Sequence, residues 1–150
     1  MEATPSILTN LQDPGLFIDD DGQGYMFWGS SNRWPIRGKK LNKQKAFKPG
    51  KGIDLFNLNP EENGWERFGE NHSDTLPRYI EGPWMTKHNG IYYLQYGAPG
   101  TEFNVYGDGA YMADNPLGPY VYMPNSPFSY KPGGFNENGV GEKSEVVKVE

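Results

Sequence analysis

The sequence predicts an all-β fold of short antiparallel strands, and three observations support this prediction. Glycine and proline are abundant, at 20 and 13 of 150 residues, without a collagen-like repeat, and this composition favours turns over helices. Aromatic residues make up 15% of the chain and recur in short runs that are typical of strands. No stretch sustains the 3.6-residue apolar period of an amphipathic helix.

Each predicted strand is a short apolar or alternating run that is bounded by turn residues. The predicted strands span residues 15–19, 24–29, 35–41, 83–88, 91–97, 109–114 and 119–123. Asp21-Gly22 and Asn89-Gly90 each separate two of these strands, and such dipeptides tolerate the positive φ that tight hairpin turns need. Residues 42–80 are predicted to form one long polar connection, and long loops on a rigid sheet commonly shape a binding cleft.

The two hairpins share one design, which indicates a repeated structural unit. A carboxylate stands before each of them, Asp13 before the first and Glu81 before the second, and a strand, a turn and an aromatic strand follow. Such a repeat suggests blades of a β-propeller, in which each blade is a small antiparallel sheet and the inner strands line a central channel. On composition alone, a single β-sandwich fits equally well.

Length and charge restrict the class of protein. A chain of 150 residues with 35% hydrophobic content predicts one domain. The net charge of −5 argues against a nucleic-acid-binding face. The chain has no cysteine, which excludes disulfides and thiol chemistry. With neither a signal-peptide pattern nor a membrane-spanning apolar run, we expect a soluble protein, and its localisation stays unknown.

Two possible metal-binding features have simpler interpretations. Residues 19–24 resemble the start of a calcium loop, but Gln23 and Ser30 stand where ligands would be needed, so we interpret this segment as a hairpin turn. His72 and His88 have no partner residues at metal-ligand spacing, so no metal ligand is predicted.

Asp13 and Glu81 are the candidate catalytic residues. Pro14 is expected to hold Asp13 in an extended conformation. Glu81 lies close to Trp84, and poor solvation in a crowded site would keep its carboxyl protonated, as a general acid requires. Taken singly, each residue also has a simpler interpretation, Asp13 as a turn-capping aspartate and Glu81 as a solvent-facing strand residue.

The ordered set of motifs resembles glycoside hydrolase family 43, the five-bladed propeller enzymes that act on arabinose- and xylose-containing polysaccharides. The matching segments are residues 13–22, 64–69, 80–85, 87–94, 95–102 and 115–120. The resemblance covers residues 12–135, which leaves residues 1–11 as a leader and 136–150 as a tail. It implies that about two to three blades are present.

The resemblance also implies an inverting glycosidase with three essential carboxylates. In this family pattern Glu81 matches the general acid, and Asp13 matches the carboxylate that tunes and orients the acid. The general base belongs to the preceding blade, where residues 1–12 contain only Glu2 as an acid. We therefore expect this chain alone to be a weak or inactive hydrolase. A catalytically inactive carbohydrate-binding or scaffold fragment of a propeller is the alternative.

The remaining expectations concern ligands and partners. Trp84, Trp28, Tyr96 and Phe68 are the candidate substrate-binding residues, because aromatic rings in the channel would stack on a sugar. No cofactor is predicted. The resemblance implies a calcium ion beside a histidine in the channel, but Glu142 replaces that histidine here. The expected partner is an oligosaccharide or polysaccharide. Neither a nucleic acid nor a membrane is expected as a partner. Open blade faces would also allow the chain to associate with a second copy of itself.

Overall fold

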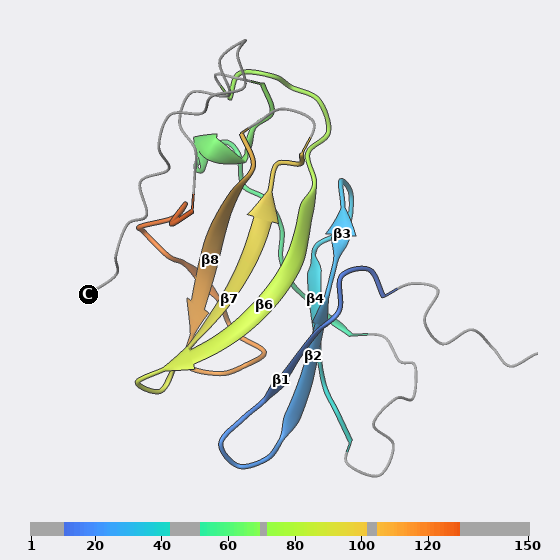
Figure 1. Ribbon diagram of the computed structural model, residues 1–150, viewed down its shortest axis with the longest axis vertical. Coiled ribbons are helices and arrows are strands. Elements are labelled where there is room, and N and C mark those ends of the chain that lie inside the picture. The colour runs from blue at the N-terminus through green and yellow to red at the C-terminus, as the bar shows by residue number, and fades with distance from the viewer. Residues whose placement is uncertain (1–10, 43–51, 70–71, 102–104, 130–150) are drawn as a thin grey trace, which may run out of the picture.

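The computed structural model describes residues 11–42, 52–69, 72–101 and 105–129, which form two antiparallel sheets (Figure 1). The first sheet has the order β1 (Gly15–Ile18), β2 (Gly24–Trp28), β4 (Ile36–Lys40) and β5 (Ile53–Phe56). The second has the order β3 (Ser30–Ser31), β6 (Ile80–His88), β7 (Ile91–Ala98), β8 (Gly107–Ala113) and β9 (Val121–Tyr122). A short 3₁₀ helix, η1 (Gly64–Glu66), precedes β6. The all-β prediction is confirmed.

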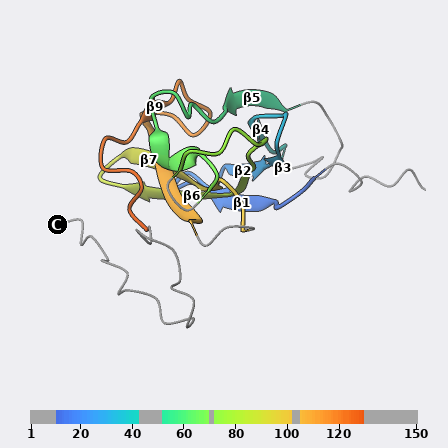
Figure 2. The same ribbon diagram turned by 90° about the horizontal axis from the view of Figure 1, so that it is seen from above.

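Apart from β3, each sheet contains four strands that follow one another in the chain and pair with their neighbours. This antiparallel meander is the arrangement of a propeller blade. The inner strands β1 and β6 are in contact where the two blades meet, and β5 and β9 lie at the outer edges, as Figures 1 and 2 show. The short strand β3 leaves the first blade after β2 and pairs with β6 of the second. The described residues therefore contain two blades.

The predicted strands are all present, but the region between residues 42 and 80 differs from the prediction. It is not one irregular connection, because β5 and η1 lie within it. β5 is a short edge strand of four residues that pairs only with β4. β6 begins three residues earlier than predicted, because a bulge between Glu81 and Trp84 lets the strand continue through the Gly-Pro dipeptide.

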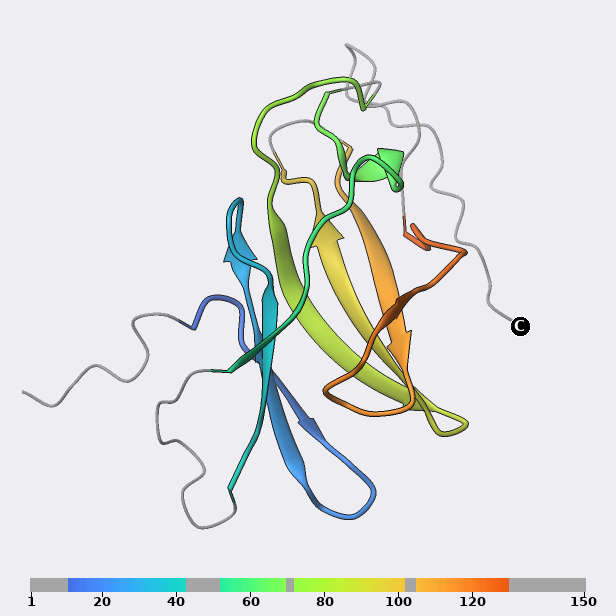
Figure 3. The same ribbon diagram turned by 180° about the vertical axis from the view of Figure 1, so that it is seen from behind.

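The core lies between the two blades and is rich in aromatic rings. Phe56 of β5 stacks on Tyr111 of β8 with ring centroids 4.0 Å apart, and Phe17 of β1 meets the edge of Tyr92 on β7 at 6.0 Å. Rings of this size remove a large apolar area from water. The blades are thus joined by a continuous hydrophobic core. Figure 3 shows the ribbon of the two blades from the opposite side.

A polar cluster lies between the two blades at the β1–β2 turn. The Lys87 ammonium lies 2.6 Å from Asp19 Oδ1 and 2.8 Å from Asp20 Oδ2. The Tyr92 hydroxyl donates to Asp19 Oδ2 at 2.6 Å. Partial burial opposes ionisation of Asp19, but the hydrogen bonds from Lys87 and Tyr92 hold its pKa below the usual value. The hairpin turn is confirmed, and its first two carboxylates bind the second blade.

No helix in the described part of the chain is long and apolar enough to cross a membrane.

Candidate active site where the two blades meet

The inner strands of the two blades are in close contact at Gly15. A Cβ atom added to Gly15 would clash with the backbone carbonyl of Pro83, so only glycine permits this approach. Gly15 lies two residues after Asp13, and Pro83 lies two residues after Glu81. The contact therefore brings the two candidate carboxylate motifs to one place, although 68 residues separate them in the chain.

Asp13 reaches across this junction to the second blade. Its Oδ2 atom accepts a hydrogen bond from the backbone N–H of Gly82 at 3.3 Å. The prediction that Pro14 holds Asp13 extended is wrong, because Asp13 has φ +49° and lies in the left-handed region. Aspartate tolerates this conformation better than most residues, and the hydrogen bond to Gly82 gives it a tertiary partner.

Glu81 is held by side chains from two other segments. The Ser30 hydroxyl of β3 donates to Glu81 Oε2 at 3.0 Å, because Ser30 and Glu81 are register partners in the sheet. The Tyr106 hydroxyl also donates to the Glu81 carboxylate. Burial, this hydrogen bond and the nearby carboxylates all raise the pKa of Tyr106, which keeps the phenol protonated as a donor.

Tyr106 reaches Glu81 because the intervening strand carries a glycine. A Cβ atom on Gly97 would clash with the Tyr106 ring, so the ring lies directly over the backbone of β7. Gly97 is the register partner of Glu81. Residues Ser30, Gly97 and Tyr106 were not among the predicted site residues, and no sequence signal for them exists, because each acts through pairing between distant segments.

The carboxylate of Glu81 is also open to a small pocket. Tyr79, Glu81, Gly100 and Thr101 line this pocket, which has a volume of about 130 Å³. Glu81 is half-buried, so it combines fixed hydrogen-bond partners with access to a molecule outside the protein. A carboxyl group that is oriented in this way can exchange a proton with a bound ligand.

The four predicted substrate-binding aromatic residues fall into two groups. Tyr96 and Phe68 are 1% and 3% exposed, so both belong to the core and neither presents an open ring face. Trp28 is 8% exposed and lines a second pocket. Trp84 is 58% exposed on β6. Of the four, only Trp84 is exposed, and Trp28 lines a pocket although most of its side chain is buried.

Tyr96 has a structural partner that the sequence did not reveal. Its hydroxyl donates to Glu66 Oε1 at 2.5 Å, and Glu66 is completely buried. Glu66 also accepts hydrogen bonds from the Asn63 side chain at 3.2 Å and the Asn59 backbone at 2.6 Å. Burial raises the pKa of Glu66 even though these donors favour its charged form. This hydrogen-bond network connects η1 to β7.

The described residues contain no group of three or more side chains suited to holding a metal ion. His72 Nδ1 lies 2.9 Å from the Arg67 carbonyl oxygen, and His88 lies beside the Asn89 amide at 3.0 Å. Glu142 and Glu2 lie outside the described residues.

Comparison with known proteins identifies the family of this chain. The model of the family "Glycosyl hydrolases family 43" matches residues 2–146. The chain is 32% identical over 112 residues to a beta-D-galactofuranosidase of Aspergillus niger, covering 75% of this chain and 27% of that protein. It is 30% identical over 141 residues to a beta-xylosidase of Xylanibacter ruminicola, covering 81% of this chain and 43% of that protein.

A solved structure shows the same relationship in three dimensions. An endo-1,4-beta-xylanase from Bacteroides thetaiotaomicron matches with a TM-score of 0.58 and 28% identity, covering 77% of this chain and 37% of that chain. The chain thus spans less than half the length of each of these three relatives.

Proposed function

This chain belongs to glycosyl hydrolases family 43, and from that premise we propose that it carries the acid side of an inverting glycosidase active site. The observation that carries the proposal is the hydrogen bond between Asp13 and the backbone of Gly82, which joins the two carboxylate motifs where β1 and β6 meet. Two carboxylates from separate blades then lie at one junction, which is an arrangement that glycoside hydrolysis can use.

In this proposal Glu81 is the general acid. It gives its proton to the glycosidic oxygen as the bond to the sugar breaks, so that the leaving group departs as a neutral alcohol. Asp13 is a positioning residue, because it holds the backbone next to Glu81. Ser30 and Tyr106 fix the direction of the carboxyl group through their hydroxyl groups.

Inversion also requires a general base about 6.5–9.5 Å from the acid, with a water molecule between the base and the sugar. We assign this base to none of the described residues. The chemistry assigned to the chain is therefore proton donation and orientation of the acid.

The proposed substrate is an oligosaccharide or polysaccharide that contains arabinose or xylose. The names of the relatives support this class, because they include a beta-xylosidase and an arabinoxylan arabinofuranohydrolase. A furanose sugar of another kind is a related possibility, since one relative is named a beta-D-galactofuranosidase. The proposal needs no cofactor.

Carbohydrate binding without hydrolysis is the second candidate function. The observation in its favour is a pocket of about 340 Å³ that is lined by two indole rings and polar side chains but by no carboxylate. Such a pocket could hold a sugar without acting on it.

The Glu81→Gln variant tests the hydrolase proposal. Both proteins are incubated with xylohexaose and with arabinoxylan oligosaccharides, the products are separated by anion-exchange chromatography, and NMR identifies the anomer released first. We expect Glu81→Gln to lower the rate at least ~100-fold, because a general acid contributes about 10²–10⁴-fold. Glu62→Gln is the matched control, since Glu62 is exposed.

An aryl glycoside with a dinitrophenolate leaving group separates the role of an acid from a general loss of structure. This leaving group departs without protonation, so Glu81→Gln should hydrolyse it almost as fast as the wild type. If the variant retains full activity on xylohexaose, Glu81 is not the acid. If the wild type binds these sugars without releasing any product, the second candidate replaces the first.

A further inference from the structure

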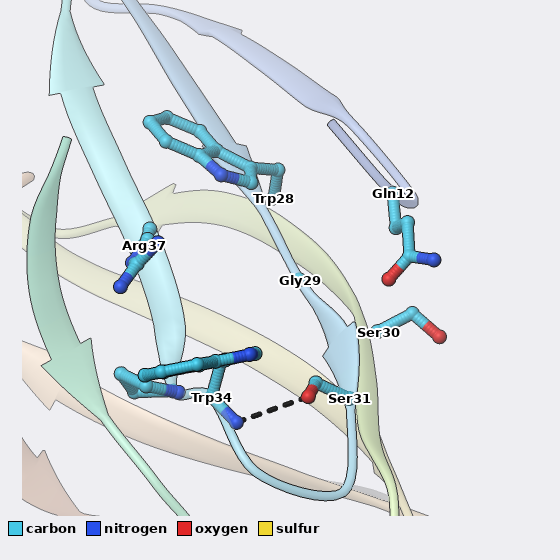
Figure 4. A pocket seen from close by; sticks show the side chains of 8 residues that line it. Gln12, Trp28, Gly29, Ser30, Ser31, Trp34 and Arg37 are labelled. Atoms are coloured by element: carbon cyan, nitrogen blue, oxygen red, sulfur yellow. Dashed lines mark hydrogen bonds between the residues drawn. The ribbon is translucent and has the colours of Figure 1, made fainter. Parts of the chain in front are cut away.

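The larger pocket, of about 340 Å³, lies on the first blade next to the candidate active site. Figure 4 shows the indole rings of Trp28 and Trp34 on opposite sides of it, with Gly29 on the chain between them. Ser31 and Arg37 also line this pocket. Of the predicted substrate-binding residues, only Trp28 lines this pocket, and Trp34 was not among them.

Trp34 is exposed but fixed in place. Its side chain is 63% exposed, yet its backbone N–H donates to Ser31 Oγ at 3.0 Å. The Arg37 guanidinium lies 5.8 Å from the centre of the Trp34 ring, within the range of a cation–π contact. An exposed large aromatic ring that is already ordered binds a ligand with little further loss of conformational entropy.

The opposite wall is rigid as well. Trp28 is only 8% exposed, and a Cβ atom on Gly52 would clash with its ring, so the backbone at Gly52 packs directly against the indole. The pocket therefore has an apolar wall on one side and an exposed aromatic platform on the other.

The charge of the pocket favours a neutral ligand. Arg37 is the only charged residue in the lining, and its Nε atom donates to Asp54 Oδ1 at 2.7 Å. Because Asp54 compensates this charge, an anionic ligand gains little from the pocket. The remaining polar groups are the hydroxyls of Ser30 and Ser31 and the amide of Gln12. Aromatic surface combined with neutral hydrogen-bonding groups suits a sugar ring with its hydroxyls.

Ser30 connects this pocket to Glu81. It lines the pocket, and its hydroxyl donates to Glu81 Oε2 at 3.0 Å. We propose that the pocket is a carbohydrate subsite in which Trp34 stacks on one sugar ring of a glycan that extends toward Glu81. The identity of the glycan rests on the proposed function, whereas the presence of the subsite rests on the pocket itself.

Binding measurements test the subsite without depending on turnover. Xylohexaose and 1,5-α-L-arabinohexaose are titrated into the Glu81→Gln chain, which leaves the sugars intact, and binding is followed by calorimetry and by tryptophan fluorescence. We expect Trp34→Ala to weaken binding about 5- to 10-fold, since an aromatic contact contributes of this order. Trp34→Phe keeps a ring and should bind within about threefold of the parent.

Val121→Ala is the control, because Val121 is an exposed apolar residue on β9 and does not line the pocket. It should leave binding unchanged. Far-UV circular dichroism checks that each variant is folded. Failure of both sugars to bind overturns the proposal, as does binding that Trp34→Ala leaves intact. A loss seen with Trp84→Ala instead places the stacking ring on β6 and also overturns it.

The two proposals fail in different ways. Trp34-dependent binding by a wild type that releases no product would support the subsite and contradict the hydrolase. Hydrolysis that needs Glu81 but shows no dependence of sugar binding on Trp34 would support the hydrolase and contradict the subsite.

Discussion

The buried contact between Tyr96 and Glu66 gives a quantitative prediction about stability. The Tyr96 hydroxyl donates to Glu66 Oε1 at 2.5 Å, and both residues are shielded from water. Tyr96→Phe removes only this hydroxyl. Glu66 then keeps two donors, the Asn59 backbone and the Asn63 side chain, and its carboxylate is less well satisfied in a place that water does not reach.

The expected magnitude follows from the charge on the acceptor. A hydrogen bond to a charged group contributes about 1.5–3 kcal/mol, whereas one between neutral groups contributes about 1 kcal/mol. Tyr96→Phe should therefore lower the free energy of unfolding by about 2 kcal/mol at a pH where Glu66 is ionised. The loss should shrink toward about 1 kcal/mol at acid pH, where Glu66 is protonated.

Glu66→Gln tests the pH dependence directly. Because burial raises the pKa of Glu66 above its ordinary value of 4.5, the protonated form favours the folded state. This contribution to stability is fully present below pH 4.5 and is lost as the pH rises through the raised pKa. The wild type should therefore lose stability relative to Glu66→Gln over that range, since the glutamine does not titrate.

Urea unfolding followed by tryptophan fluorescence at several pH values measures both effects. Tyr93→Phe is the matched control, because it removes the same hydroxyl from the same strand on the opposite face. A loss for Tyr96→Phe that is below 0.5 kcal/mol or equal to that of the control would refute the reasoning, taking ~0.5 kcal/mol as the usual effect of a surface substitution. So would a stability difference between the wild type and Glu66→Gln that does not change with pH.

Two further predictions concern the junction of the blades. Gly15→Ala should lower the free energy of unfolding by about 1–3 kcal/mol, because its Cβ would clash with the Pro83 carbonyl, whereas Gly64→Ala, which meets open space, should not. Equal melting temperatures for the two variants would contradict this. Lys87→Met should lower the urea midpoint at pH 7, because it removes the cationic partner of Asp19. The pKa of Asp19 is lowered, so this contribution is present above pH 3.8 and is lost as the pH falls through the lowered pKa. A deficit that persists at pH 2 would contradict the role of the ion pair.

Local sequence patterns account for most of the strands. Gly22 and Gly90 adopt the positive φ that their turns require, so the two hairpins follow from residues next to each other in the chain. The edge strand β5 was missed because a run of only four residues within a long polar segment gives a weak signal, and its pairing with β4 and the packing of Phe56 are tertiary contacts. The two-residue strand β3 was missed for the same reason, since it depends on pairing with a segment about 50 residues away.

The sequence was also sufficient to select Asp13 and Glu81 as candidates, because each of them lies in a motif of consecutive residues. It could not show how the two motifs meet. Their contact depends on the absence of a side chain at Gly15 and on a hydrogen bond from Gly82, and these two features act between different blades. The roles of Ser30 and Tyr106 depend in the same way on strand pairing around Glu81.

The aromatic residues show most clearly which features depend on tertiary packing and not on the local sequence pattern. Composition indicates that such a chain must bury many rings, but it does not distinguish Tyr96 in the core from Trp34 at a pocket. For Tyr96 that distinction depends on which face of β7 meets the other blade, because a shift of one residue in register would exchange the two faces. For Trp34 it depends on the position of the loop between β3 and β4. Turns and most strands therefore follow from neighbouring residues, whereas the candidate active-site junction is produced by contacts between distant ones.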